Sequence, residues 1–377
     1  MRFWYNPNFL AIITLVILSI PALKSLTQSG FYTSHDGETH AARIAQYYQA
    51  ITDGQLPPRF AGSFYNGLGS PIFVYIYPLP YFLGSALHAL TFSFVDSFKI
   101  LMAASLVFSG VFSYLWLAEI LKSEKAAFLG ALFYAWVPYR FLLIYVRGSL
   151  SEVLAYTFLP LVLFCLTKLS ATRNLLWIAS TAVATSLLLL SQNLVAAITL
   201  PTVIGYLAIL SLHQKSPRAF LFGLVAIFWG FLISAVTYLP AFFEREFVRL
   251  DEIIRIAYPD HFVTFAQLIR SPWGYGFDLP GTINDQLSLQ IGLAHIFVFF
   301  ITLALIFNQL RRKNFQKQTT LAVYFGAVVL VSIFLMLQTK ITTYVWQQIK
   351  LLHIIDIPWR FLGLVSLALT YLAAYST

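Results

Sequence analysis

Long apolar segments separated by short polar turns run along almost the whole chain. A helix needs about 20 mainly apolar residues to cross a bilayer. The segments that reach or approach this length are 9–26, 71–90, 98–121, 126–138, 153–167, 174–190, 194–212, 219–243, 291–310, 319–338 and 361–377. The first has no clean cleavage site after Pro21, so we expect an uncleaved anchor and not a signal peptide. The pattern predicts an all-α, polytopic transmembrane protein with one transmembrane domain over residues 1–377.

The segment 71–90 differs from the others because it carries Pro71, Pro78 and Pro80, and proline interrupts helical hydrogen bonding. Basic residues give a separate test, since short cytoplasmic loops are enriched in lysine and arginine. The basic turns are Lys122/Lys125, Lys168/Arg173, Lys215/Arg218 and Arg311/Arg312/Lys313/Lys317. All four fall on the side of Arg2 only if 71–90 does not cross. We therefore predict an interfacial or re-entrant segment at 71–90, about ten crossings and cytoplasmic termini in the cytoplasmic (inner) membrane.

This topology leaves four segments outside the cytoplasm, at 27–97, 139–152, 244–290 and 339–360. The first and third are too long for simple turns and mix aromatic with charged residues. Long loops of this kind are usually functional when they are ordered. We expect the first to contain juxtamembrane helices, and we expect function on the extracytoplasmic face.

The first outer segment contains the sequence HDGETH followed by a helical pattern that runs from Glu38 to a stop at Asp53-Gly54. Its predicted apolar face consists of Ala41, Ile44, Ala45, Tyr48 and Ile51. Asp36, His40, Arg43 and Tyr47 share another face. Asp36 has two interpretations: an N-cap that holds backbone N–H groups, or a general base that accepts a proton from an attacking hydroxyl. His35, Asp36, Glu38 and His40 also have the atoms to hold a divalent cation, although carboxylates two residues apart indicate this only weakly.

Arginines characterise the second and last outer segments. Arg140 and Arg147 suit a phosphate, because a guanidinium matches phosphate oxygens in a bidentate manner. Glu152 follows Arg147 by five residues, so an ordinary interfacial ion pair is the alternative. Arg360, in the sequence DIPWRFLGL, lies at headgroup depth at the start of the final apolar segment, near enough for a lipid phosphate.

Two further sites complete the candidate set. Gln192 and Asn193 form a polar outer turn that can hydrogen-bond a ligand or simply make the turn. Glu244 and Arg245 stand where an apolar segment leaves the membrane, and Trp273-Gly274-Tyr275 suits either a sugar face or a lipid headgroup belt.

Composition sharpens this picture. With 59% apolar and 10% charged residues, the chain is far from the roughly 25% charged residues of soluble domains. The net charge of +9 would suggest nucleic acid on a soluble protein, but the predicted topology assigns all of it to the cytoplasmic turns. A single cysteine excludes an intrachain disulfide. The sequence contains no phosphate-binding loop motif, so it gives no indication of a nucleotide site. Most apolar segments lack ionisable residues, which argues against proton-coupled or ion transport.

The ordered motifs resemble bacterial membrane proteins of the 6-pyruvoyl-tetrahydropterin synthase-related family, which looks like a branch of the GT-C glycosyltransferase superfamily. They are HDGETH, NGLGSPIFVYIYPLPYF, RGSLSEVLAYTFLPL, SQNLVAAITLP, YLPAFFER, W-G-Y-G, LQIGLAHI and DIPWRFLGL. Nothing resembles the soluble pterin enzyme, so that part of the name implies no activity. The resemblance implies juxtamembrane helices in the first outer loop, Asp36 as catalytic base with Glu38 and His40 as neighbours, and Arg147 and Arg360 as phosphate ligands. Family members often carry His where Gln192 stands, so an acid–base role there is absent.

The implied reaction is transfer of a sugar from a polyprenyl-phosphate donor, bound within the lipid bilayer, to an extracytoplasmic acceptor. Family chains are generally longer, so we expect this chain to be truncated at its C-terminus or to be a short member. Two other functions stay open from the sequence: a non-catalytic protein that flips or presents lipid-linked glycans, and a neutral-solute transporter. The sequence indicates neither the cofactor, if any, nor the oligomeric state.

Overall fold

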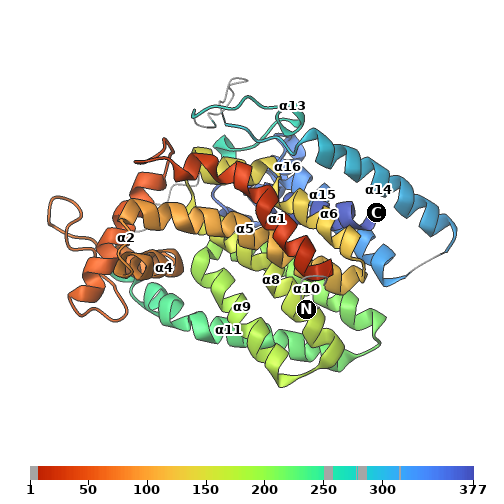
Figure 1. Ribbon diagram of the computed structural model, residues 1–377, viewed down its shortest axis with the longest axis horizontal. Helices are drawn as coiled ribbons and strands as arrows, with labels where there is room; N and C mark the ends of the chain where they lie inside the picture. Colours follow the sequence, from red (N-terminus) through yellow and green to blue (C-terminus); the bar gives the residue numbers. More distant parts are fainter. Residues whose placement is uncertain (1–6, 250–257, 277, 279–286, 314–315) are drawn as a thin grey trace.

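The computed structural model describes residues 7–249, 258–276, 278, 287–313 and 316–377. Helices dominate these ranges, and the β-structure among them is limited to isolated bridges. The apolar segments form α1 (Pro7–Leu23), α5 (Phe94–Leu121), α6 (Glu124–Ala135), α8 (Leu150–Thr172), α9 (Leu175–Ser191), α10 (Asn193–His213), α11 (Pro217–Phe243), α14 (Leu293–Arg311), α15 (Lys317–Met336) and α17 (Leu362–Tyr375). The predicted all-α polytopic membrane fold is confirmed (Figure 1).

Shorter elements occupy the connections. They are η2 (Lys24–Thr27), α2 (Gly37–Thr52), α3 (Ile72–Tyr75), α4 (Leu79–Ala89), α7 (Pro138–Phe141), η3 (Leu142–Arg147), η4 (Arg245–Phe247), η5 (Tyr258–Asp260), α13 (Phe265–Ile269), α16 (Lys340–Gln348), η6 (Lys350–Ile354) and η7 (Pro358–Phe361). Most of them belong to the four predicted outer segments.

In the described part of the chain, fewer helices are long enough to cross a membrane than the ten or so that the sequence pattern predicts. Among the described residues, seven helices are long and apolar enough to cross a membrane. An eighth crossing is obtained if α6 and the segment 138–147, which are bent by 43° relative to each other, count as one span. α9 has 17 residues and α17 has 14, so both fall short. The described chain therefore supports seven to eight crossings, and ten stays a prediction.

The proline-rich segment 71–90 does not form a continuous spanning helix. It divides into α3 and α4, which are separated by the extended residue Ile76, and α4 begins beside Pro78. α4 packs on α2 and α5 instead of pairing as a full-length span. Each helix is too short to cross a bilayer, which agrees with the predicted interfacial or re-entrant segment.

The four basic turns lie together at one end of the bundle, away from α2 (Figure 1). Glu119 accepts from Lys122 at 2.6 Å and from Lys168 at 2.8 Å, which joins the first two turns. Beside the third and fourth turns, the ring Nε2 of His213 is hydrogen-bonded to the Thr320 hydroxyl at 2.9 Å. The shared end is what the charge pattern predicts. Which side of the membrane it faces stays a prediction, and Arg2 lies outside the described residues.

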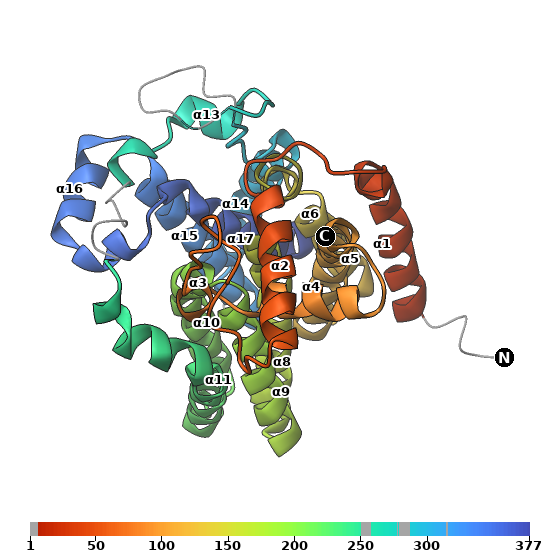
Figure 2. The ribbon, with the colours of Figure 1, turned by 90° about the vertical axis from the view of Figure 1, so that its left-hand side faces the viewer.

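α2 buries a different face from the predicted one. Its buried residues are Gly37, His40, Ala41, Ile44, Tyr47 and Ala50, whereas Ala45, Tyr48 and Ile51 are only partly buried. The ring of His40 stacks at 5.9 Å on Tyr81 of α4 and at 6.4 Å on Phe98 of α5. These aromatic partners come from distant segments and turn the polar face of α2 toward the protein. Figure 2 shows α2 lying across the end of the bundle in front of α4 and α8.

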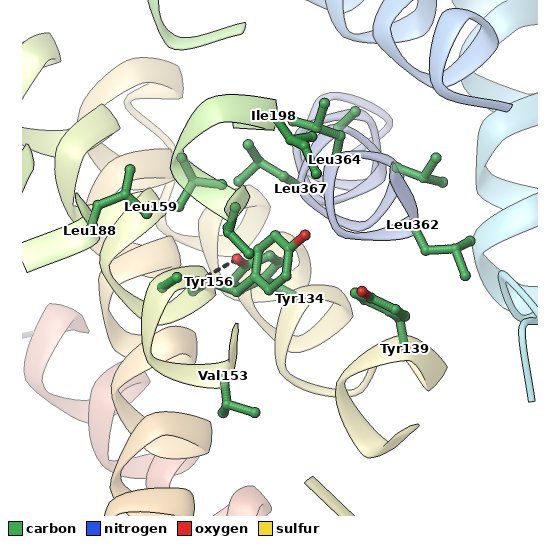
Figure 3. Close-up of a cluster of buried hydrophobic side chains, with 14 of the residues drawn as sticks. Tyr134, Tyr139, Val153, Tyr156, Leu159, Leu188, Ile198, Leu362, Leu364 and Leu367 are labelled. Carbon is green, nitrogen blue, oxygen red and sulfur yellow. Dashed lines mark hydrogen bonds between the residues drawn. The ribbon is translucent and has the colours of Figure 1, made fainter. Parts of the chain in front are cut away.

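The centre of the bundle is formed by α5, α6, α8 and α17. α17 is almost completely buried, and it packs against α6, α14 and α15. Gly363 allows a close approach, because a Cβ atom there would overlap the ring of Tyr156. Tyr134, Tyr139 and Tyr156 face the space beside Leu362 of α17 (Figure 3). This core supports the outer ends of α8 and α17, where the charged residues gather.

Candidate functional site

Five charged side chains from three of the predicted outer segments meet at the end of the bundle that contains α2 and form what we call the outer charge cluster. Its members are Asp36, Arg147, Glu152, Asp356 and Arg360. Arg147 donates through Nη1 to Glu152, while its Nη2 lies 3.6 Å from Oδ2 of Asp36. Arg360 lies with Nε 3.4 Å from the same Glu152 oxygen and donates through Nη1 to Asp356. The structure thus brings together four of the predicted site residues: Asp36, Arg147, Glu152 and Arg360.

Glu152 is the buried centre of this cluster. Its side chain is completely buried at the start of α8, and each oxygen has a hydroxyl neighbour: Ser149 at Oε1 and Tyr139 at Oε2, both at 3.4 Å. A buried carboxylate is costly unless it is paired and hydrogen-bonded. The two arginines therefore keep Glu152 charged, and Glu152 in turn fixes the position of both guanidinium groups.

A glycine turn brings the first outer loop to Arg147. η3, a π-helical turn, ends at Arg147, and Gly148 follows it with a φ of +62°. The backbone N–H groups of His35 and Asp36 donate to the carbonyls of Val146 and Arg147 at 2.9 and 2.8 Å. A Cβ atom at Gly148 would lie 2.7 Å from Ser34 Oγ, so glycine is needed for this close docking.

Asp36 has the position of an N-cap but does not use its side chain as one. It directly precedes α2, and its carboxylate accepts no capping hydrogen bond. The side chain is 47% exposed, and it forms an ion pair with Arg147. This geometry leaves the carboxylate accessible to solvent while a cation lies beside it. Glu38, two residues further on, is exposed.

The segment before α17 supplies two residues that the sequence analysis did not identify. Asp356 pairs with Arg360 four residues later, and the Trp359 ring lies 5.0 Å from the guanidinium carbon of Arg147. Trp359 also donates its Nε1–H to Asp278, which pairs with His261 at 2.5 Å. The third outer loop is therefore attached to the cluster through Trp359, and also through the His35 ring, whose Nε2 lies 3.0 Å from the Tyr275 carbonyl oxygen. The i, i+4 spacing of Asp356 and Arg360 was a usable signal, whereas the contacts of Trp359 and Asp278 depend on the tertiary fold.

His40 and Arg43 lie on α2 behind Asp36 and share Tyr81. Arg43 can only donate, and its Nη1 lies 3.3 Å from the Tyr81 hydroxyl oxygen. The Tyr81 proton is then directed to Nδ1 of His40 at 3.2 Å, which makes that nitrogen an acceptor. Burial, with the Arg43 and Arg147 charges, lowers the pKa of His40 to about 3. His40 is consequently neutral at physiological pH and part of the support for the Asp36 loop.

The remaining predicted residues lie outside these ion pairs. Arg140 is buried against the Tyr134 ring, and Gln192 caps α10 by accepting from the Leu194 N–H at 3.1 Å. Asn193 is exposed, and Arg245 is exposed at η4. Glu244 pairs with Arg59 of the first outer loop. Within the described ranges, no group of three His, Cys, Asp or Glu side chains is placed to hold a metal ion. Parts of the predicted outer loop 244–290 lie outside the described residues.

An apolar groove of about 460 Å³ is lined in part by residues that are adjacent in sequence to members of the outer charge cluster. It is formed by α10, α15, η6 and the start of α17, and the residues that line it carry no charge. Its wall includes Ile355 and Phe361, the neighbours in sequence of Asp356 and Arg360. A second groove, of about 490 Å³, lies between α3, α4 and α11 and is bordered by Arg59. Both are suited to hydrocarbon chains.

The fold and these sites define a polytopic α-helical membrane protein with a cluster of ion-paired side chains at one end of its bundle. Comparison with known proteins adds a family. Residues 73–259 match the model of a family described as 6-pyruvoyl-tetrahydropterin synthase related domain, a membrane protein. The family predicted from the motifs is thus confirmed over this segment, which contains Arg140, Arg147 and Glu152; the GT-C-like branch stays a prediction.

The chain is also similar to a protein of a named bacterium. The chain is 24% identical over 241 residues to an uncharacterized protein of Lactococcus lactis subsp. cremoris (strain MG1363). This match covers 63% of the chain and 39% of the relative. The matched part therefore spans about two fifths of the relative's length, and the activity of the whole protein is a matter for proposal.

Proposed function

We propose that this protein is an integral membrane glycosyltransferase that transfers a sugar from a polyprenyl-phosphate donor to an acceptor outside the cytoplasm. The observation that carries the proposal is the outer charge cluster, where the accessible carboxylate of Asp36 lies 3.6 Å from Arg147. One group can accept a proton while the other faces a phosphate. In an inner membrane with the basic turns in the cytoplasm, this cluster faces outward.

Asp36 is the proposed general base. Its side chain is about half exposed, and its backbone N–H donates to the Arg147 carbonyl, which fixes its position. The carboxylate can therefore accept a proton from an acceptor hydroxyl that approaches from solvent. The acceptor oxygen forms a bond to the anomeric carbon, its proton passes to Asp36, and the bond from that carbon to the phosphate oxygen breaks. The polyprenyl phosphate leaves with the bonding electrons, and no further reactant is needed.

Arg147 and Arg360 are the proposed phosphate ligands. Each guanidinium has five N–H donors, and the carboxylate pairs seen here use only part of them. Glu152 holds both groups in place, so a phosphate meets preorganised cations. The three carboxylates of the cluster outnumber the two arginines, which favours release of the charged product over its tight retention.

The apolar groove beside Ile355 and Phe361 is the proposed place for the isoprenoid chain. A chain in this groove lies against α10 and α15, and its phosphate end is next to the segment that carries Arg360. Glu38, His40, Arg43, Gln192, Asn193, Glu244 and Arg245 are proposed to shape the surrounding outer surface and not to react. No metal ion or nucleotide is required by this scheme.

The test is transfer of radiolabelled sugar from purified polyprenyl-phosphate sugars in proteoliposomes. We expect Asp36→Asn to lower the transfer rate by about 10²–10⁴-fold, the usual contribution of a general base. Asp53→Asn is the matched control, because Asp53 is an exposed carboxylate at the other end of α2. Equal transfer by the wild type and Asp36→Asn would remove the base.

One observation favours a second function. Both arginines of the cluster already have carboxylate partners, as in a purely structural network. A protein that only flips or presents lipid-linked glycans would bind the donor and move its label across the bilayer without transferring the sugar. Donor binding with no transfer to any acceptor tried would support that function.

A further inference from the structure

Arg140 is a buried cation without a carboxylate partner. The residue is only 3% exposed. In the described part of the chain, its guanidinium takes part in no ion pair within 4.0 Å. Two of its nitrogens, Nε and Nη1, are buried and have no hydrogen-bond acceptor. Polar atoms buried in this way are nearly always satisfied by protein, water or an ion. Arg140 therefore indicates a missing acceptor.

Among the described neighbours, the Tyr134 hydroxyl oxygen is placed to accept from the guanidinium, but Nε and Nη1 are left without an acceptor. Its guanidinium carbon lies 4.7 Å from the centre of the Tyr134 ring. The Tyr134 hydroxyl donates to the Tyr156 carbonyl at 2.5 Å, and the Tyr156 hydroxyl donates to the Arg360 carbonyl at 3.1 Å. Ser366 donates to the Leu362 carbonyl at 2.6 Å. These contacts leave the positive charge of Arg140 facing tyrosine rings and hydroxyl groups, with no negative charge to balance it.

Arg140 lines a small cavity between α6, α7, α8 and α17. The cavity has a volume of about 10 Å³ and is also lined by Tyr134, Val137, Tyr139, Leu143, Tyr156, Gly363 and Ser366. A space of roughly 10–15 Å³ holds one water-sized particle. A phosphate group is several times larger, so Arg140 does not belong with Arg147 and Arg360 as a phosphate ligand in this conformation.

We propose that this cavity binds a single chloride ion, held by Nε–H and Nη1–H of Arg140 beneath the tyrosine rings. Chloride is a monovalent anion somewhat larger than water, so the side chains that line the cavity must move slightly apart to admit it. It then accepts both unpaired N–H groups and balances the charge. A neutral water would accept them but leave the buried cation without a balancing charge. The proposal concerns this anion alone and does not depend on sugar transfer.

The direct test uses bromide, which replaces chloride and can be located by its anomalous scattering. We expect one bromide peak beside Arg140 in crystals of the full chain grown in bromide. Water density at this position without an anomalous peak would overturn the proposal, and this result does not require any variant to fold.

A solution test uses melting temperature in nanodiscs with chloride replaced by gluconate at constant ionic strength. We expect chloride, and bromide likewise, to raise the melting temperature of the wild type saturably, by about 2 °C, through binding to the folded state. Arg140→Met should abolish this dependence. Arg270→Met, which changes an exposed arginine, is the control and should keep it. A wild-type melting temperature independent of the halide, or one with the same halide dependence in Arg140→Met, would contradict the site.

Discussion

The buried arginines of this protein fall into two groups, and their positive charges are balanced in different ways. Arg147 and Arg360 both contact Glu152 and each has a further carboxylate, Asp36 or Asp356. Arg140, seven residues before Arg147, has a tyrosine ring and a small cavity instead. The first group is balanced within the chain and opens to the outside through Asp36. The described residues give the second no carboxylate partner, and its charge is left to the proposed chloride.

The difference teaches where each kind of ligand can bind. A cluster with exposed carboxylates and a neighbouring apolar groove can exchange partners with a large lipid phosphate. A small cavity beside two unpaired N–H groups has room only for a small anion. The same residue type thus serves a proposed substrate site and a proposed ion site within one segment of chain.

The largest expected effect comes from changing Glu152, the buried centre of the outer charge cluster. Glu152→Gln leaves two arginines without their shared carboxylate, and removing one partner of a buried pair typically costs about 3–5 kcal/mol. We expect a clear loss of thermal stability in nanodiscs, together with loss of sugar transfer. Glu119→Gln is the control, since its lysine partners lie at the partly exposed basic end and such a pair is worth about 0–1 kcal/mol. Similar losses in both variants would contradict a special role for Glu152.

A pH effect is expected from His40, which supports the loop of the paired group. Its folded-state pKa of about 3 lies below the ordinary histidine pKa of 6.5, so the unfolded chain binds more protons between these values. Stability should be complete above pH about 6.5 and fall as the pH decreases toward 3. The loss should be on the order of 1–3 kcal/mol at pH 4, measured by thermal unfolding. His40→Gln should flatten this dependence, and an unchanged profile in the variant would show that another group is responsible.

A smaller effect is expected from changing the turn that docks the Asp36 loop. Gly148→Ala places a Cβ atom 2.7 Å from Ser34 Oγ at a positive φ of +62°. We expect a cost of about 1–2 kcal/mol, the usual penalty for this backbone conformation, and weaker transfer as Asp36 moves from Arg147. Gly326→Ala is the matched control, because no atom lies within 4 Å of its added Cβ and it is in the middle of α15. The control should be neutral or slightly stabilising. Equal stability of the two variants would mean that the docked loop tolerates displacement.

The smallest expected effect is at the rim of the paired group. Asp356 is 40% exposed and pairs with Arg360 at i, i+4, so Asp356→Asn should cost at most about 1 kcal/mol. It should also strengthen phosphate binding by removing a competing charge, which donor-binding titrations can measure. A stability loss as large as that of Glu152→Gln would place Asp356 at the centre of the network.

Much of the arrangement can be predicted from local sequence. Apolar length predicts the spanning helices, the prolines predict the break in 71–90, and Asp53-Gly54 predicts the end of α2. The proximity of Arg147 and Glu152 also follows from their spacing at the start of α8. These features depend on neighbours within about one or two helical turns.

The parts that were not predicted depend on distant segments. The buried face of α2 is set by Tyr81 and Phe98, which a helical pattern in residues 38–52 does not contain. Trp359 reaches Arg147 across more than half of the chain. Arg140 and Arg147 look equivalent in the sequence, since seven residues are about two α-helical turns, and only the fold separates them.

The π-helical turn η3 explains why Arg140 and Arg147 face different surroundings. Residues Leu142–Arg147 are wound wider than an α-helix, so Arg147 does not follow Arg140 on one face. Such a turn behaves as one residue added to an α-helix. Winding the same residues as a regular α-helix would place Arg147 about two turns beyond Arg140 and bring both guanidinium groups to the same side. A change of winding, with no change in length or in any side chain, would then join the proposed anion cavity and the proposed substrate surface into one site.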